Sequence, residues 1–355
     1  MKLAEKGLLT GVGSLPYTEA KPALEMIWNH VPLLPHWPQL PMAGVDENFS
    51  LQYLQALVGL GLVKSDDGLY YDLADPKWLD KVTEFYSIYL NAVEGDSSSL
   101  ERFSFPPEAA RGFYAFVKDL KEGGTRQALY LKGQLSGPLT VGFQLNSPDK
   151  KPCYYDPQLR DILVKNLALH GIWQVKKLKE FGLPVIMMVD EPGLYAFGSS
   201  THITLAREEI ISDLNAIYAG IKAEGASVGT HVCAGTDWTL LFDSEVEIVN
   251  FDAYDFFDSM KVFPEQLDAF LRRGGVLAWG IVPTSAKILA ESPTSLTDRF
   301  EGYLKELEAR GISRGLVLDQ SIFTPSCGTG TLGAELAERI YQTLSEFGVL
   351  TKVRG

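Results

Sequence analysis

Short apolar runs alternate with helical segments along most of the chain, and this alternation limits the folds that the sequence can adopt. Most of these runs are apolar throughout, which is typical of parallel strands that helices cover on both faces. Eight strand–helix units in one chain predict an α/β fold, a single (β/α)8 barrel of the TIM type. We place the eight predicted strands near residues 8, 32, 129, 186, 228, 248, 276 and 316.

The segments between the strands are predicted to be helical. The longest, 157–181, begins at a proline and is stopped by Gly182, as expected of a helix C-terminus. A doubly wound open sheet is the alternative fold, but no GxGxxG motif follows the first strand, which counts against a dinucleotide-binding fold. The other predicted helices are 18–29, 76–92, 107–121, 204–224, 236–243, 264–273, 293–310 and 332–347, with a turn at 65–68.

Length and charge limit the class of protein. The chain of 355 residues is long enough for one large barrel, and no Pro/Gly/Ser linker divides it, so we expect one catalytic domain over residues 1–355. The net charge of -13 argues against nucleic-acid binding and against an anionic membrane surface, because both need clustered Lys and Arg. No apolar run approaches the roughly 20 residues that span a bilayer, and no secretory leader is recognisable. We therefore expect a cytoplasmic protein.

Polar side chains recur at the places where the apolar runs stop. In a (β/α)8 barrel the active site lies at the C-terminal ends of the strands, so side chains from several strands would contribute to it. The predicted strands end at Gly13-Ser14, His36-Trp37, Gln134, Asp190-Glu191, His231 with Cys233, Asp252, Thr284 and Asp319.

His231 and Cys233 end the predicted strand at 227–233 and are separated by one residue, in a chain with only three cysteines and five histidines. Alternate residues of a strand point the same way, so both side chains can reach one metal ion. Imidazole nitrogen and thiolate sulfur together suit zinc. The alternative is a buried cysteine beside a hydrogen-bonded core histidine.

Cys327 is the second candidate cysteine ligand. It lies 94 residues beyond Cys233, after the predicted eighth strand. If the barrel closes, this loop comes near the loops after the fifth and sixth strands, and Cys327 joins His231 and Cys233 as a third ligand. Asp252 is the predicted fourth ligand, with nearby aspartates as substitutes. The alternative for Cys327 is a small buried residue in a tight loop.

The predicted ligands are scattered over different strands, as in catalytic zinc sites and unlike many structural sites. A thiol that coordinates a metal is deprotonated, and thiolate is the nucleophilic form of sulfur. Such a site is suited to binding a substrate thiol and transferring an alkyl group to it. Hydrolysis by a zinc-bound water is the competing use.

Five short motifs follow one another between about residues 7 and 345, in the order GVGSLP, QLSGPLT, VDEPGL, THVC and PSCG. Together they resemble the C-terminal catalytic barrel of cobalamin-independent methionine synthase, in the superfamily that also contains uroporphyrinogen decarboxylase. The resemblance implies a zinc-dependent methyltransferase that methylates the thiol of homocysteine to form methionine. It also implies that His231, Cys233 and Cys327 hold zinc, with Asp190, His231 and Cys233 as catalytic residues.

The resemblance implies further roles around the metal. Ser14, with Gly13 and the neighbouring backbone, would hold the carboxylate of the amino acid. Asp190 would bind the amino group, and Glu47 is the best match for a further glutamate in this role. The fourth zinc ligand of the family is a glutamate on the sixth strand, and its match here, Asp252, is one carbon shorter.

Two departures from the family bear on the methyl donor. The full-length enzyme carries an N-terminal barrel that helps to hold its polyglutamyl folate, and we expect no such barrel here. The family also has a histidine after the seventh strand that serves proton transfer, and residues 280–285 contain none. A folate donor needs its nitrogen protonated before it can leave, whereas a methyl-cobalt donor does not. We therefore expect a methyl-corrinoid protein as the donor, with methyl-folate as the alternative.

Two other functions stay open. The His-x-Cys pair with a distant cysteine is also similar to the zinc methyltransferases related to uroporphyrinogen decarboxylase, such as coenzyme M methyltransferases, whose thiol acceptor is different. The remaining alternative is a non-catalytic barrel that binds a small molecule or a partner. Asp190 and Ser14, placed for the charged ends of an amino acid, favour homocysteine.

Overall fold

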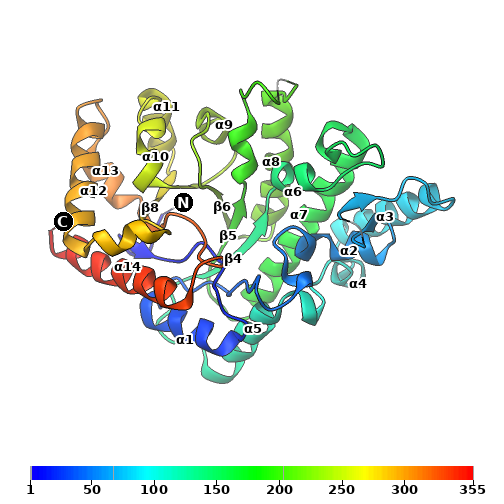
Figure 1. The fold of residues 1–355 in the computed structure, drawn as a ribbon, viewed down its shortest axis with the longest axis horizontal. Coiled ribbons are helices and arrows are strands. Elements are labelled where there is room, and N and C mark those ends of the chain that lie inside the picture. Colours follow the sequence, from blue (N-terminus) through cyan, green and yellow to red (C-terminus); the bar gives the residue numbers. More distant parts are fainter. Residues whose placement is uncertain (1, 67, 203, 355) are drawn as a thin grey trace.

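A curled parallel sheet lies at the centre of the computed structural model (Figure 1). The structure describes residues 2–66, 68–202 and 204–354, so Asp67 of the predicted turn lies outside the described residues. The strand order is β1-β9-β8-β7-β6-β5-β4, and all neighbouring pairs are parallel, which confirms the predicted α/β architecture. The strands of this sheet are β1 (Leu8–Leu9), β4 (Leu131–Ser136), β5 (Val185–Asp190), β6 (Ser227–Val232), β7 (Ile248–Phe251), β8 (Val276–Val282) and β9 (Ser321–Pro325).

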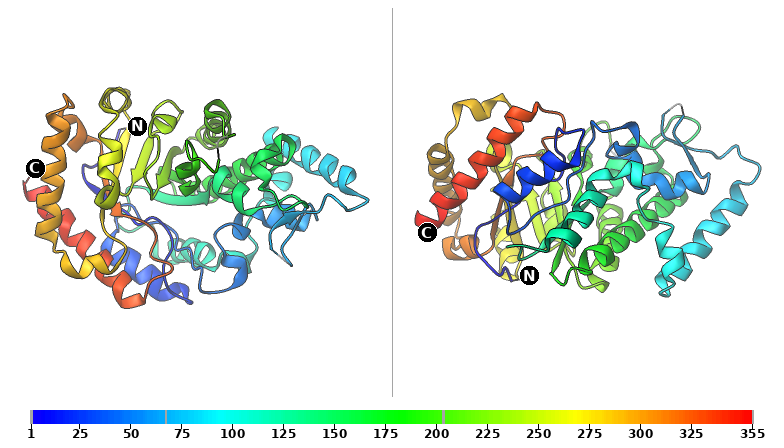
Figure 2. Two further views of the ribbon diagram at one scale, coloured as in Figure 1. Left: turned by 45° about the horizontal axis from the view of Figure 1, so that its top comes forward. Right: turned by 90° about the horizontal axis from the view of Figure 1, so that it is seen from below.

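Helices surround the sheet, with α3 and α4 at one end of the molecule and α12 to α14 at the other (Figure 2). The α-helices are α1 (Ala20–His30), α2 (Gln55–Gly59), α3 (Trp78–Val93), α4 (Ser97–Glu101), α5 (Arg111–Gly123), α6 (Pro138–Gln144), α7 (Pro157–Lys179), α8 (Arg207–Ala223), α9 (Thr239–Phe242), α10 (Ala253–Met260), α11 (Pro264–Arg272), α12 (Pro293–Glu308), α13 (Arg314–Asp319) and α14 (Ala334–Arg354). The 3-10 helices are η1 (Val45–Glu47), η2 (Leu51–Leu54), η3 (Pro107–Ala109), η4 (Cys153–Tyr155), η5 (Pro192–Ala196) and η6 (Ala286–Ala290). None of the helices in the described ranges combines the length and the apolar character needed to cross a membrane.

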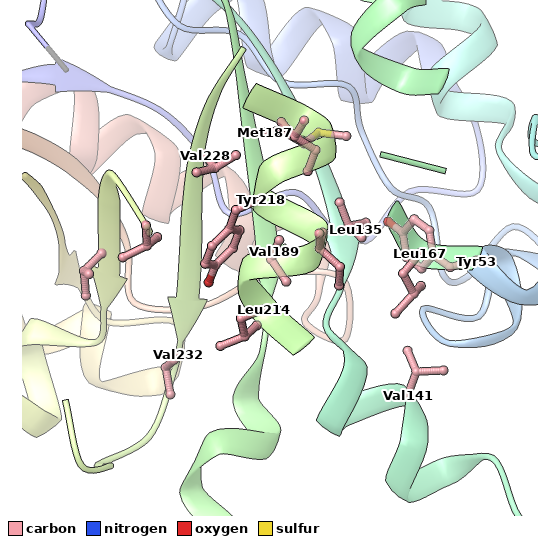
Figure 3. Packing of buried hydrophobic residues seen from close by; sticks show 14 of the residues in the cluster. Tyr53, Leu135, Val141, Leu167, Met187, Val189, Leu214, Tyr218, Val228 and Val232 are labelled. Atoms are coloured by element: carbon pink, nitrogen blue, oxygen red, sulfur yellow. The ribbon is translucent and has the colours of Figure 1, made fainter. Parts of the chain in front are cut away.

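The outer face of the sheet packs on helices through aliphatic and aromatic side chains (Figure 3). Val228 and Val232 of β6 and Val189 of β5 belong to this core, together with Tyr218 of α8. The hydroxyl groups of Tyr218 and Thr230 share a hydrogen bond of 2.5 Å. Full burial of one aliphatic side chain stabilises the fold by about 1.5–3 kcal/mol. Because β6 turns its valines outward to this core, the alternate residues of the strand face inward.

The inner face of the sheet carries a separate apolar layer with polar residues above it. Gly229 lies in this layer because a Cβ there would be 2.3 Å from Sδ of Met188. The apolar layer consists of Leu8, Leu34, Tyr130, Ile186, Met188, Ile248, Val276, Ala278 and Ile322. Two residues further along their strands, on the same face, are Lys132, Asp190, His231, Asn250 and Thr324. The strand pleat therefore places these polar side chains on the inner face of the sheet, and Asp190 and His231 among them lie near the C-terminal ends of their strands.

The segment 33–40 lies between β1 and β4, where we predicted the second of the eight strands, near residue 32. On one side, Lys132 N donates to Pro35 O (3.0 Å), and on the other, Gln39 N donates to Gly13 O (3.1 Å). The segment forms isolated parallel bridges at both places and no continuous ladder. Its prolines have no N–H to donate, which prevents regular strand pairing. Within the described ranges the large sheet therefore has seven regular strands, and the expected eighth is an extended segment.

The prediction of a strand near residue 316 is wrong. Residues 314–319 form the helix α13, which Ser313 caps by accepting a hydrogen bond from Leu316 N (3.4 Å). The last strand, β9, follows this helix at Ser321–Pro325. A short apolar run does not distinguish a strand from a buried helix by periodicity, which explains the error. The small antiparallel hairpin of β2 (Val63–Lys64) and β3 (Tyr70–Tyr71) was also not predicted.

Candidate metal centre

The side chains of His231, Cys233 and Cys327 come together at the C-terminal ends of the strands. His231 lies in β6, Cys233 follows β6 directly, and Cys327 lies two residues after β9. One ligand atom from each residue lies within 4.8 Å of the other two. Among the described residues, these three are the group that could hold a metal ion. The structure thus brings together three of the four predicted ligands.

The curl of the sheet and the loop after β9 bring Cys327 to Cys233. Since β7 and β8 lie between β6 and β9, the ends of these strands would be about 14 Å apart in a flat sheet. The loop after β9 packs closely against the segment after β1, because a Cβ on Gly328 would be 2.1 Å from Oγ of Ser14. Because Gly328 has no side chain, the PSCG segment can lie close to Ser14, over the C-terminal ends of the strands.

His231 is held on one side of its ring and has a nitrogen without a partner on the other. Its Nδ1 lies 2.6 Å from Oδ1 of Asn250. Its Nε2 is buried and has no hydrogen-bond partner in the described part of the chain. An unpartnered buried polar atom costs about 1–3 kcal/mol. A metal ion beside the two sulfur atoms would provide this partner, so the residues present fit a metal.

The two thiols influence each other. The pKa of Cys233 is lowered chiefly by the neighbouring Cys327 thiol, and the charge of a protonated His231 lowers it further. The pKa of Cys327 is raised by the Cys233 thiolate beside it and by burial. A second thiolate would form only if a cation compensated the charge of the first. Two thiolates and one imidazole are a donor set that zinc prefers.

Asp252 caps a helix instead of joining this group. Its Oδ1 accepts a hydrogen bond from Asp255 N (2.9 Å) at the start of α10. Burial raises the pKa of Asp252 to about 6. It is not among the residues whose ligand atoms lie within 4.8 Å of one another. The structure therefore does not bring the predicted fourth ligand to the other three, and its short side chain is used in the helix cap.

A cavity of about 620 Å³ lies beside the three ligands, and Ser14 and Asp190 also line it. This volume is in the range of small-molecule sites. Asp190 ends β5 and pairs in register with His231 of β6. Its Oδ1 is buried without a hydrogen-bond partner among the described residues. An ammonium group in the cavity would supply both a donor and a compensating charge.

Burial raises the pKa of Asp190 to about 6, and the positive charges of His231 and then Lys132 oppose this shift. With a pKa of about 6, the half-buried carboxyl group is mostly ionised at neutral pH. A buried carboxylate with a free acceptor is an electrostatic site for a cationic group. This geometry is compatible with the predicted role of Asp190, which stays a prediction.

Ser14 lines the cavity, and its polar groups hold the loop after β9. Its carbonyl oxygen accepts from Thr329 N (3.0 Å), and its hydroxyl accepts from Gly330 N (3.2 Å). Gly13 is not among the residues that line the cavity. A Cβ at Gly13 would lie 3.0 Å from the Gln134 side chain. Ser14 therefore positions the Cys327 loop, Gly13 packs against Gln134, and the contact of both residues with a carboxylate stays a prediction.

Glu47 lies behind the cavity wall. The neighbouring residues Val45 and Asn48 line the cavity, whereas Glu47 is fully buried and does not. One carboxylate oxygen accepts from Arg111 N (3.0 Å), and the other has no partner among the described residues. Burial raises the pKa of Glu47. The structure does not place Glu47 at the cavity surface, so its role in binding an amino group stays a prediction.

Lys132 and Asn250 are buried polar residues of this region that the sequence motifs did not reveal. Nζ of Lys132 donates to Val12 O (2.6 Å), and burial lowers the pKa of Lys132 to about 8 against the attraction of Asp190. Asn250 faces His231. The signal in the sequence is the one polar residue of β7 for Asn250, and the charged residue inside β4 for Lys132. Cys153 is buried and is not in the metal group.

Comparisons with known proteins find similar solved structures, two of which are B12-independent methionine synthases by their descriptions, whereas no protein-family model and no curated protein matches the chain. A B12-independent methionine synthase from Shewanella sp. W3-18-1 in complex with selenomethionine is 17% identical, with a TM-score of 0.47 over 68% of this chain and 67% of that chain. A Listeria monocytogenes protein described as a candidate vitamin-B12-independent methionine synthase is 17% identical, with a TM-score of 0.45 over 68% of this chain and 69% of that chain. At these values neither structure establishes the function of this chain.

Proposed function

We propose that this chain is a zinc-dependent methyltransferase that transfers a methyl group to the thiol of homocysteine and forms methionine. The observation that carries the proposal is the group of one imidazole and two thiols within 4.8 Å, beside a cavity with a buried, unpartnered carboxylate oxygen. The first feature fits a metal that binds thiols, and the second fits the ammonium group of an amino acid.

His231, Cys233 and Cys327 would hold the zinc ion. A bound zinc ion would favour the thiolate form of a substrate thiol, which is the nucleophilic form of sulfur. Three protein ligands leave a position for substrate, as in other catalytic zinc sites. Asp252 stays the predicted fourth ligand, and it would have to give up its hydrogen bond to Asp255 N to reach the metal.

Asp190 would bind the ammonium group of homocysteine, while Ser14 and the neighbouring backbone face its carboxylate. Both residues line the same cavity as the metal group, so one small amino acid can contact all of them. The methyl transfer forms a carbon–sulfur bond and breaks the bond between the methyl group and its donor, and the thiol proton leaves before the transfer. The walls of the cavity position the substrate and limit the access of water.

The proposed methyl donor is a methyl-corrinoid protein, with methyl-folate as the alternative. His231 is the histidine that lines the cavity, and its Nδ1 is already bonded to Asn250. In the loop after β8, the hydroxyl of Thr284 bonds to the hydroxyl of Ser326 (3.0 Å). The described residues around the cavity therefore offer no second imidazole to protonate a folate nitrogen. A methyl-cobalt donor does not need this proton.

The coenzyme M type of methyltransferase is the second candidate function. It would use the same three ligands with a different thiol acceptor. Coenzyme M is an anionic thiol without an amino group, so it would not compensate the buried charge of Asp190. This favours homocysteine. We further propose that residues 1–355 act as one catalytic domain, and a cytoplasmic location stays a prediction.

The test is methionine formation from homocysteine, with methylcobalamin and methyl-folate offered in separate reactions. We expect methionine with methylcobalamin, and loss of this activity in Cys233→Ser. Cys153→Ser changes a cysteine outside the metal group and should keep the activity. Activity with methyl-folate alone would contradict the corrinoid donor. Methylation of coenzyme M but not of homocysteine would contradict the proposed acceptor.

A further inference from the structure

Asn250 connects His231 to two other strands of the sheet. It lies on the inner face of β7, where its Cα pairs in register with that of His231 on β6. Its side chain is 3% exposed. The amide nitrogen donates to Ala278 O of β8 (2.8 Å) and to the hydroxyl of Thr324 of β9 (2.9 Å). One buried side chain thus bonds to three strands, and two of them lead into the loops that carry the candidate ligands.

The orientation of the Asn250 amide follows from these partners. The main-chain oxygen of Ala278 can only accept a hydrogen bond, so the NH2 end of the amide has to face it. In the reversed orientation two oxygens would face each other in a buried place. The carbonyl end of Asn250 is therefore directed at His231, with Oδ1 2.6 Å from Nδ1.

This orientation determines which nitrogen of His231 carries the proton. Oδ1 of an amide can only accept, so Nδ1 of His231 has to be the donor. In a neutral ring the lone pair is then on Nε2. Nε2 is the buried atom without a hydrogen-bond partner among the described residues. It is thus the nitrogen that His231 offers to the group with Cys233 and Cys327.

We propose that Asn250 is a positioning residue, which fixes the Nδ1–H tautomer and the ring orientation of His231 so that Nε2 is available as a ligand. The metal-binding part of this inference rests on the proposed zinc-dependent function, whereas the tautomer does not. Hydrogen bonds of this kind to a ligand histidine fix its tautomer and raise its basicity. Here a neutral amide takes the place of the more common carboxylate or main-chain oxygen.

The first experiment is a long-range ¹H–¹⁵N NMR spectrum of the full chain with labelled histidine, recorded without metal at a pH where the ring is neutral. The loss of one set of signals in His231→Gln assigns the His231 ring. We expect the proton on Nδ1 in the wild type and in Asn250→Asp, since a carboxylate oxygen also accepts from Nδ1. In Asn250→Leu the two tautomers should exchange or reverse. A wild-type spectrum with the proton on Nε2 would overturn the proposal.

The second experiment measures zinc affinity by competition with a chromophoric chelator. Loss of a partner to a ligand histidine typically weakens metal binding about 10- to 100-fold, and we expect this for Asn250→Leu. Asn250→Asp loses the bond to Ala278 O and should be less stable, but it should keep most of the affinity. Thr324→Val removes the other acceptor of the Asn250 amide, and this variant should also keep most of the zinc affinity.

The outcomes separate a positioning role from a structural one. If the affinities of all three variants fell in parallel with their stabilities, Asn250 would be structural and the proposal would be wrong. If the wild type bound no zinc while its proton lay on Nδ1, the zinc-dependent function would be wrong and the effect of Asn250 on the tautomer would stand.

Discussion

Asp190 is the residue whose buried charge most directly selects a substrate. Its carboxylate faces the cavity with one oxygen unpartnered. Asp190→Asn keeps the shape and removes the charge. A hydrogen bond to a charged group contributes about 1.5–3 kcal/mol, so we expect kcat/KM for homocysteine to fall about 10- to 100-fold, mostly through KM. Steady-state kinetics of the two proteins measure this.

The control for this variant is Asp80→Asn, which makes the same change at an exposed position of α3. It should leave both kinetic constants unchanged. Zinc content should be the same in all three proteins, because Asp190 is outside the metal group. An unchanged KM in Asp190→Asn would remove the argument for an amino-acid substrate.

Lys132 is a buried cation, and burying its charge lowers the stability of the fold by an amount that depends on pH. Burial lowers its pKa to about 8 from the ordinary value of 10.5. Below about pH 8 both the folded and the unfolded chain hold the proton, and the folded chain bears the full cost of burying it. Between about pH 8 and 10.5 the folded chain has released the proton and the unfolded chain has not, so the contribution of Lys132 to stability rises with pH. The shift corresponds to about 3 kcal/mol.

We therefore expect Lys132→Met to be more stable than the wild type near neutral pH, with an advantage that shrinks as the pH rises to about 10. Uncharged Lys132 still donates to Val12 O, which methionine cannot do. Urea unfolding at a series of pH values measures the difference. Lys305→Met, at an exposed position of α12, should show no such trend. An advantage of Lys132→Met that did not change with pH would be incompatible with a buried ammonium.

At the residue level, the sequence predicted the candidate metal group better than its surroundings. His231, Cys233 and Cys327 were predicted because cysteine and histidine are rare in this chain and occur at strand ends. Asn250 and Lys132 were missed because the pleat, which decides that they face inward, depends on the strand register. Asp252 was predicted from its position, but its short side chain caps α10 in the structure.

At the scale of elements, Glu191 joins β5 to α6. Its carboxylate accepts from Leu139 N (2.9 Å), from Thr140 N (2.7 Å) and from the Thr140 hydroxyl. A Cβ on Gly137 would lie 2.2 Å from Oε2 of Glu191, so this contact requires glycine at 137. The QLSGPLT and VDEPGL motifs are therefore joined by a structural contact. This contact lies beside Asp190, the candidate substrate-binding residue.

Glu191→Gln should destabilise the fold without changing the metal group. A glutamine offers one acceptor oxygen, and its NH2 end would face a buried donor that loses its partner. Such a loss costs about 2 kcal/mol, which urea unfolding can measure. Glu308→Gln, the same change at an exposed residue of α12, should have no effect. A stable Glu191→Gln protein that failed to bind homocysteine would instead show that Glu191 belongs to the site.

A capping residue marks the start of some predicted helices and also of helices that were missed, such as α10 and α13. The helix α7 begins at Pro157 as predicted, because Asp156 accepts from Gln158 N and Leu159 N. The prediction of a strand near residue 316 was wrong because the four residues 316–319 are too few to distinguish the periodicity of a strand from that of a helix. Ser313, which caps α13, was the residue in that segment that indicated the start of a helix.

At the scale of the whole molecule, the site depends on the curl of the sheet. The order of strand–helix units was predictable, since parallel strands covered by helices are apolar along their whole length. The approach of Cys327 to Cys233 was not, because it depends on how the extended segment 33–40 and the loop after β9 close the gap across the strand ends. The sequence suggested closure through the count of strands and through the resemblance of its motifs to a barrel family.

The most direct test of the proposed function is the zinc content of the purified full-length chain. We expect one zinc ion per wild-type chain and per Cys153→Ser chain, and little or none in Cys233→Ser and Cys327→Ser. Addition of homocysteine to the zinc-loaded wild type should shift its zinc edge spectrum, because a sulfur atom joins the metal. A wild-type chain that takes up no zinc, or variants that keep it, would contradict the metal centre on which the proposed function depends.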